Sequence, residues 1–216
     1  MQKLAKILSS SKWFFTGFAI VIVLGLVPQL LYSQNKLFLF INGWHSKFFD
    51  TFFYLLTYFG DGITFVLLIL ALLFISYSDA LIGLIIFLIT SLIAQGLKHI
   101  FFADHYRPFK VLSGQYQLHI PAGVDPIVSL SFPSGHTVTA FAMATFLVMT
   151  LPTKKIKLLL LILATLTAYS RVYLTHHFPV DVWAGALIGT LGAILIYWLV
   201  GDKFDHKLGQ KSLLNR

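Results

Sequence analysis

The chain has 216 residues, of which 57% are hydrophobic and only 11% are charged. Soluble domains carry about 25% charged residues, so the composition excludes an ordinary water-soluble globule. Lys and Arg number 16 against 8 acidic residues, a basic excess found both in nucleic-acid-binding proteins and in the inner loops of membrane proteins. The lack of cysteine excludes disulfides, thiolate metal sites and cysteine nucleophiles.

Long neutral runs between the charged residues predict six membrane-spanning helices. A span needs about 20 mostly apolar residues, or fewer where flanking side chains snorkel. The first run follows three lysines, as in a signal peptide, but it is too long and no small-residue cleavage site follows, so we expect it to be retained. In chain order, the predicted spans are approximately 13–32, 62–77, 80–99, 135–151, 156–174 and 182–200.

The stretch 48–59 is very aromatic but short, and it ends at Gly60-Asp61-Gly62. Its length favours an interfacial helix against the outer leaflet over a seventh span. No linker, low-complexity tract or repeat is visible, and the only long polar connection is at about 100–133. We therefore expect residues 1–216 to form one all-α integral membrane domain.

The distribution of basic residues predicts the orientation in the membrane. An even number of spans puts both termini on one side, and ten of the 16 basic residues then fall on that side. These are Lys3, Lys6, Lys12, Lys154, Lys155, Lys157, Lys203, Lys207, Lys211 and Arg216, whereas Lys36, Lys47, Lys98, Arg107, Lys110 and Arg171 fall on the other. The positive-inside rule then predicts cytoplasmic termini in an inner (cytoplasmic) membrane.

Polar residues collect at the outer ends of the third to sixth predicted spans. Boundary snorkelling explains any one of them, but it explains the joint set poorly, because ionisable groups at such depths are costly and usually functional. The set comprises Lys98, Arg107-Pro108, Pro133-Ser134-Gly135-His136, Ser170-Arg171, His177 and Asp181. We expect an active site at these outer helix ends.

The chemistry of this set points to a phosphate. A helix that begins at Ser134-Gly135 offers backbone N–H groups of both residues and the positive end of the helix dipole. Lys98, Arg107 and Arg171 add fixed positive charge, and the planar guanidinium suits a phosphoryl group. Three cations beside a helix terminus are typical of a site for a multiply charged oxyanion.

His177 and Asp181 are four residues apart, with Pro179 between them in the first turn of the sixth span. The carboxylate can then accept a hydrogen bond from one imidazole nitrogen and leave the other as a nucleophile. His136 is the second imidazole, suited to protonate a leaving oxygen. A metal site is the alternative, but the three cations disfavour a divalent ion. His176 is a weaker candidate than His177, because position 180 is Val rather than an acid.

These residues resemble the motifs of the type-2 phosphatidic acid phosphatase superfamily, the membrane lipid phosphate phosphatases. The P-S-G-H segment stands intact at 133–136, and the S-R-x5-H-x3-D segment comprises Ser170, Arg171, His177 and Asp181. The first family segment, K-x6-R-P, is two residues longer here, from Lys98 to Arg107-Pro108, with Lys110 as the only near substitute for Lys98.

The resemblance implies metal-independent hydrolysis through a phosphohistidine, without a cofactor. By position, His177 resembles the nucleophile, Asp181 its orienting partner and His136 the acid and later the base. The residues similar to the family's phosphate cradle are Lys98, Arg107, Ser134, Gly135 and Arg171. Soluble vanadium-dependent haloperoxidases share this cradle, but the predicted spans argue against that activity.

The expected partner is a lipid phosphate at the bilayer surface, and nucleic acid is not expected. Undecaprenyl diphosphate, phosphatidylglycerol phosphate, phosphatidic acid and the phosphates of lipid A all fit, and the loop at about 109–132, with Tyr116, His119 and Asp125, is expected to select among them. A lipid phosphotransferase with the same site is one alternative. A small-anion transporter is another, although transporters place polar groups near mid-membrane.

Overall fold

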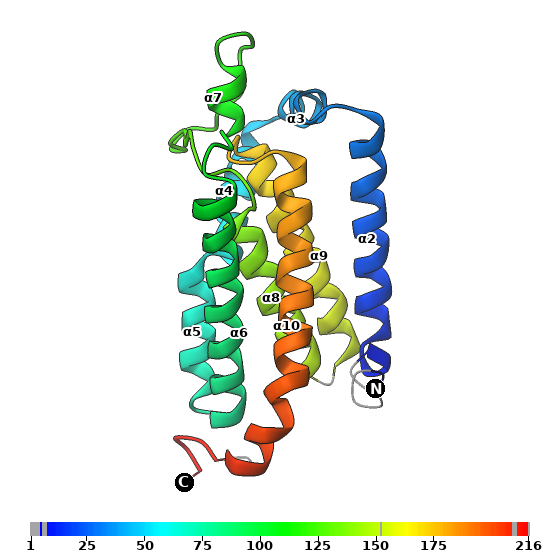
Figure 1. Ribbon diagram of the computed structural model, residues 1–216, viewed down its shortest axis with the longest axis vertical. Coiled ribbons are helices and arrows are strands. Elements are labelled where there is room, and N and C mark those ends of the chain that lie inside the picture. The colour runs from blue at the N-terminus through cyan, green and yellow to red at the C-terminus, as the bar shows by residue number, and fades with distance from the viewer. Residues whose placement is uncertain (1–4, 6–7, 152, 209–210, 216) are drawn as a thin grey trace.

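The computed structural model describes residues 5, 8–151, 153–208 and 211–215, and these residues form helices and loops with no strand among them. Six of the described helices run lengthwise side by side (Figure 1). They are α2 (Lys12–Leu31), α5 (Gly62–Leu72), α6 (Tyr77–Gly96), α8 (Gly135–Thr150), α9 (Lys154–Tyr173) and α10 (Pro179–Leu208). The shorter elements are α3 (Gln34–Asn42), α4 (Lys47–Leu56), the 3-10 turn η1 (Thr57–Gly60), the π-helical turn η2 (Leu97–Phe101) and α7 (Pro108–Leu112).

The helices confirm the all-α membrane class, whereas the number of spans stays a prediction. Among the described residues, four helices are long and apolar enough to cross a bilayer: α2, α6 with η2, α9 and α10. The segments Lys47–Gly60 and Gly62–Leu72 pass the same test only as a pair, which is bent by 52°. Helix α8 is apolar but has 16 residues. An interfacial position of residues 48–59 is therefore also untested.

Several helix ends differ from the predicted ones for local reasons. Helix α5 ends at Leu72 instead of 77, because Ser76 already caps α6: its Oγ accepts the N–H of Asp79 at 3.1 Å. Helix α10 runs past both ends of the predicted 182–200, and Pro179 suits its first position. Helix α3, which lies across the end of the bundle in Figure 1, was not predicted.

Close packing of α8 against α10 brings the P-S-G-H segment at the start of α8 next to Asp181, the last residue of the S-R-x5-H-x3-D segment. Gly185 and Gly189 lie on the face of α10 that carries Asp181, since the three positions are four residues apart. A Cβ at Gly185 would lie 2.9 Å from the carbonyl oxygen of Ser134, and one at Gly189 would collide with the carbonyl of Val138. Small residues at this spacing let two backbones approach. The start of α8 therefore rests against the first turn of α10.

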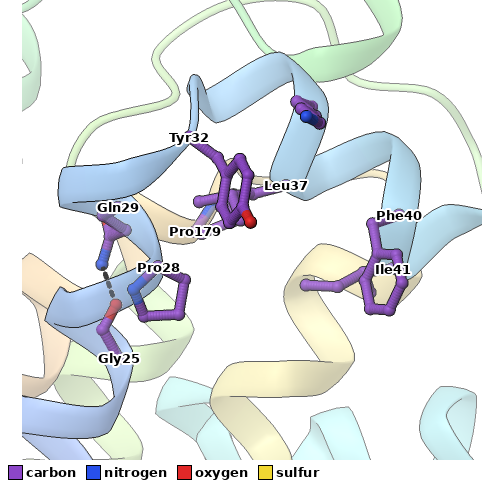
Figure 2. Close-up of a pocket in the computed structure, with 9 residues that line it drawn as sticks. Gly25, Pro28, Gln29, Tyr32, Leu37, Phe40, Ile41 and Pro179 are labelled. Atoms are coloured by element: carbon purple, nitrogen blue, oxygen red, sulfur yellow. Dashed lines mark hydrogen bonds between the residues drawn. The ribbon is translucent and has the colours of Figure 1, made fainter.

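Near the start of helix α2, Phe14 and Phe18 are buried against the bundle, but only 11% of its most apolar stretch is buried. The later part of α2 stands apart from the other lengthwise helices (Figure 1). Hydrogen bonds hold the helix at two levels, from Lys157 Nζ to Ser11 Oγ (2.8 Å) and from Trp183 Nε1 to the Ile22 carbonyl (3.0 Å). A pocket of about 620 Å³ opens between α2, α3 and the start of α10. Figure 2 shows its largely apolar wall, which includes Pro28, Tyr32, Leu37, Phe40 and Pro179.

The basic residues separate between the two ends of the bundle. Helices α2 and α9 begin, and α10 ends, at the lower end in Figure 1, where Lys12, Lys155, Lys157 and Lys203 lie. Lys211 lies beside the start of α6, since its carbonyl accepts the N–H of Tyr77 at 2.8 Å. Of the other residues predicted for that side, Lys3, Lys6 and Arg216 and the side chains of Lys154 and Lys207 lie outside the described part. The candidate site residues belong to the opposite end, as the sequence predicted.

Candidate active site

All eight predicted site residues come from segments that meet at the upper end of the bundle in Figure 1. Lys98 lies in η2, Arg107 precedes α7, residues 134–136 begin α8, Arg171 lies in the last turn of α9, and His177 and Asp181 flank the start of α10. The three cations, His177 and Asp181 are buried. Buried charges of this kind need partners, and each of these side chains has at least one in the contacts below, although Arg171 Nε has none among the described residues.

Lys98 and Arg107 share one acceptor. Lys98 Nζ donates to the carbonyl oxygen of Leu130 at 2.8 Å, and Arg107 Nη2 donates to the same oxygen at 3.4 Å. Arg107 Nε also donates to the carbonyl of Ser129 at 2.8 Å. The stretch between Lys98 and Arg107 consists of the rest of the π-helical turn η2 and the loop after it, and both side chains reach the Leu130 carbonyl although the motif is two residues longer. Lys110 is exposed on α7, whereas Lys98 is buried.

Arg171 crosses from the last turn of α9 to η1. Its Nη1 donates to Thr57 Oγ1 at 2.6 Å, and its Nη2 lies 2.6 Å from His176 Nδ1. Its Nε is buried and, among the described residues, has no hydrogen-bond partner. An unsatisfied buried donor costs about 1–3 kcal/mol, so an anionic oxygen beside it would be stabilised.

His177 lies between a carboxylate and a guanidinium. Its Nδ1 is 3.4 Å from Asp181 Oδ2, and its Nε2 is 3.4 Å from Arg107 Nη1. Because a guanidinium only donates, Nε2 carries the lone pair and Nδ1 the hydrogen, which is directed at Asp181. Burial and the positive charges of Arg107, Arg171 and Lys98 hold the pKa of His177 well below its ordinary value. The ring is therefore neutral at neutral pH, as a nucleophile must be.

The start of α8 differs from the prediction in one respect. The Ser134 N–H was expected to be free for an anion, but it donates to the backbone carbonyl of Asp181 at 3.0 Å, because α8 and α10 pack so closely. Ser134 Oγ instead accepts from the N–H and the hydroxyl of Thr137. Within the described residues, the N–H groups of Gly135 and His136 donate no hydrogen bond, and a Cβ at Gly135 would meet open space.

His136 has a carboxylate neighbour that motif spacing did not identify. Asp61 Oδ2 lies 3.9 Å from His136 Nε2, and both side chains are about one-third exposed. Asp61 also caps α5, since its Oδ1 accepts the N–H of Ile63 at 2.9 Å. Gly60 permits the approach, because a Cβ there would lie 2.5 Å from the carbonyl oxygen of His136.

Sequence reasoning also missed Ser131, Thr57 and the role of His176. Ser131 Oγ donates to Asp181 Oδ2 at 2.5 Å, a shorter contact than that of His177 with the same oxygen. Ser131 lies 50 residues from Asp181 and Thr57 lies 114 residues from Arg171, whereas His176 is only five residues from Arg171. The only available signal was that polar residues flank the predicted outer helix ends.

No group of three or more metal-ligating side chains is assembled among the described residues. The absence of a metal stays a prediction, and the donor set around His177, with one carboxylate and three cations, suits an anion. None of the eight residues lines the pocket of Figure 2, although Pro179, between His177 and Asp181 in the chain, does.

Comparisons with known proteins identify relatives of the chain. The family model of the PAP2 superfamily matches residues 79–205. A lipid A 4'-phosphatase of Bacteroides thetaiotaomicron is 28% identical over 81% of this chain and 78% of its own length. The bacitracin transport permease protein BcrC of Bacillus licheniformis is 35% identical, and an undecaprenyl-diphosphatase of Sulfolobus acidocaldarius is 40% identical. These two matches span 49% and 38% of the relatives' lengths, so the chain matches half of those proteins or less.

Two solved structures share the fold. LpxE of Aquifex aeolicus superposes with a TM-score of 0.68 and 31% identity, over 76% of this chain and 93% of that one. The PAP2-type phosphatidylglycerolphosphate phosphatase of Bacillus subtilis superposes with a TM-score of 0.60 over 92% of this chain and 96% of that one. Its 24% identity supports the fold alone.

Proposed function

Since the chain belongs to the PAP2 superfamily, we propose that it is an integral membrane phosphatase that hydrolyses the phosphate monoester or diphosphate headgroup of a lipid. The observation that carries this proposal is the position of the buried His177 imidazole between two charged groups: Nδ1 faces Asp181 and Nε2 faces Arg107. The available nitrogen thus faces the guanidinium that would hold the phosphoryl oxygens.

The reaction takes two steps. His177 Nε2 attacks phosphorus, a P–N bond forms, and the P–O bond to the leaving group breaks while His136 supplies the proton. His136 then takes a proton from water, whose oxygen displaces the imidazole and releases inorganic phosphate. Lys98, Arg107, Arg171 and the Gly135 N–H balance the charge of the phosphoryl oxygens, which is the main task in phosphoryl transfer.

The proposed membrane arrangement has six spans, in which α5 and α8 join the four long helices, and α4 lies before α5 as an interfacial helix. Helix α8 is about 24 Å long at 1.5 Å per residue, less than the roughly 30 Å of hydrocarbon, but it is enclosed by neighbouring helices. Lysines at one end of the bundle support a cytoplasmic location of that end and a site on the non-cytoplasmic side of the inner membrane.

The substrate class rests on the relatives, whose names include lipid A 4'-phosphatase and undecaprenyl-diphosphatase. The test is a phosphate-release panel in detergent and EDTA over undecaprenyl diphosphate, phosphatidylglycerol phosphate, phosphatidic acid and lipid A. We expect the purified protein to release phosphate from at least one of them, because positioned cations replace a metal. His177→Ala should lower the rate by about a thousandfold or more, since it removes the nucleophile.

His99→Ala is the matched control, because His99 is an exposed histidine at the same end of the bundle. The proposal fails if no lipid phosphate is hydrolysed, if EDTA abolishes turnover, or if His177→Ala keeps near-normal turnover. A phosphotransferase would pass the phosphoryl group to an added lipid or sugar acceptor instead of to water. A transporter, the class suggested by the name of one relative, would move phosphate into liposomes without hydrolysis.

A further inference from the structure

His176 lies beside the nucleophile and touches the phosphate site through its ring. Its Nδ1 is 2.6 Å from Arg171 Nη2, and its Nε2 is 3.3 Å from the carbonyl oxygen of Asp125. A guanidinium can only donate, and a carbonyl can only accept. Nδ1 must therefore be the unprotonated nitrogen and Nε2 must carry the hydrogen. The contacts fix both the neutral state and the tautomer of this ring.

The ring completes the set of groups that holds Arg171. Thr57 Oγ1 accepts from Nη1, and His176 Nδ1 accepts from Nη2, so both terminal nitrogens are engaged by the protein. The buried Nε is left without a partner among the described residues. Two fixed corners of a planar guanidinium determine where the third nitrogen points. Loss of the His176 contact would free the guanidinium to turn about its contact with Thr57.

His176 also contacts the second arginine, but through its backbone. Its carbonyl oxygen accepts from Arg107 Nη1 at 3.1 Å. The N–H groups of His176 and His177 both donate to the carbonyl of Arg171, which closes the turn between α9 and α10. A change of the His176 side chain therefore alters the support of Arg171 while the backbone contact with Arg107 remains available.

From these contacts we infer that His176 is a positioning residue of the phosphate site. Its Nδ1 holds the Arg171 guanidinium so that Nε stays available to a phosphoryl oxygen. This inference rests on the proposed function of the same site. Burial and the positive charge of Arg171 lower the pKa of His176 to about 3, so the ring accepts from Arg171 throughout the neutral range.

The test compares His176→Ala with His176→Asn, whose amide oxygen can replace Nδ1 as an acceptor, and with His99→Ala as the control. The readouts are kcat/KM on a lipid phosphate and the affinity for inorganic phosphate, measured as competitive inhibition and as phosphate-induced thermal stabilisation. His176→Ala should weaken both readouts by about tenfold to a hundredfold, as expected for a lost hydrogen bond to a charged group. His176→Asn should recover most of the loss, and His99→Ala should match the wild type.

A double-mutant cycle with Arg171→Ala distinguishes positioning from a general structural role. If His176 acts through Arg171, His176→Ala should add little to the loss caused by Arg171→Ala alone. Equal losses in both backgrounds would overturn the inference, as would a wild-type level in His176→Ala or an Asn variant no better than Ala. The phosphate-affinity measurement needs no turnover, so failure of the proposed hydrolysis and failure of this inference are separate outcomes. If His176→Ala does not fold, His176→Asn decides alone: affinity near the wild type supports the inference, and a tenfold loss overturns it.

Discussion

One carboxylate oxygen of Asp181 both caps the start of a helix and contacts residues of the candidate site. Helix α10 begins at Pro179, and Asp181 Oδ2 accepts the N–H of Phe178, the residue before the helix, at 2.9 Å. In a capping box, the side chain at the third helical position accepts the N–H of the residue before the helix in the same way. The same oxygen accepts from Ser131 Oγ at 2.5 Å and faces His177 Nδ1. The helix cap thus orients the group that fixes the tautomer of the nucleophile.

Ser131→Ala should lower kcat by about fivefold to fiftyfold, because the carboxylate loses its shortest hydrogen bond and no longer holds His177 as firmly. Ser129→Ala is the matched control, since Ser129 contacts Arg107 through its backbone carbonyl. Steady-state phosphate release from purified variants measures the effect. Equal rates for the two variants would show that the Ser131 hydrogen bond does not help Asp181 to orient His177.

Spacing along the chain predicted the residues that belong to motifs, and it missed those that meet the motifs only in three dimensions. His177 and Asp181 are four residues apart, so a helical turn implies their contact. Ser131 lies 50 residues from Asp181, and Thr57 lies 114 residues from Arg171, so no local pattern reports either contact. The free Ser134 N–H was wrongly predicted because a helix start was considered without its neighbour α10.

At the scale of elements, the face of α10 that carries Asp181, Gly185 and Gly189 determines how closely α8 approaches. Long apolar runs predicted most of the lengthwise helices near their observed positions. The short helix α3 and the π-helical turn η2 were not foreseen. Helix α3 begins through a local cap, in which Ser33 accepts the N–H of Lys36. The π turn changes helical pitch over five residues, and apolar periodicity does not resolve such a change.

Gly185→Ala should destabilise the protein by about 1–3 kcal/mol, because the added Cβ meets the Ser134 carbonyl, which is backbone and cannot rotate away. It should also lower phosphate release, since it moves the start of α8 away from Asp181. Gly96→Ala is the control, because a Cβ there meets nothing within 4 Å. Thermal unfolding in detergent is the measurement, and equal melting temperatures for the two variants would contradict the close α8–α10 contact.

The whole molecule separates its few charges between two ends. Lysines that begin α2 and α9 occupy one end, and the cations of the candidate site occupy the other. The sequence predicted this division, because the chain has few ionisable residues. Once the predicted spans had assigned ten basic residues to one side, three of the other six belonged to the candidate site. The number of spans could not be predicted as firmly, since α5 and α8 are shorter than the bilayer is thick and depend on packing against their neighbours.

The central claim, a metal-independent phosphatase site on the non-cytoplasmic side, is tested most directly with oriented membrane vesicles. Right-side-out vesicles that contain the protein receive from outside EDTA and a membrane-impermeant, short-chain form of the lipid phosphate that the detergent panel identifies as a substrate, and released phosphate is measured. We predict release from wild-type vesicles, none from His177→Asn vesicles, and little from inverted vesicles until detergent opens them. Release from inverted vesicles alone, or equal release from the His177→Asn vesicles, would contradict the account.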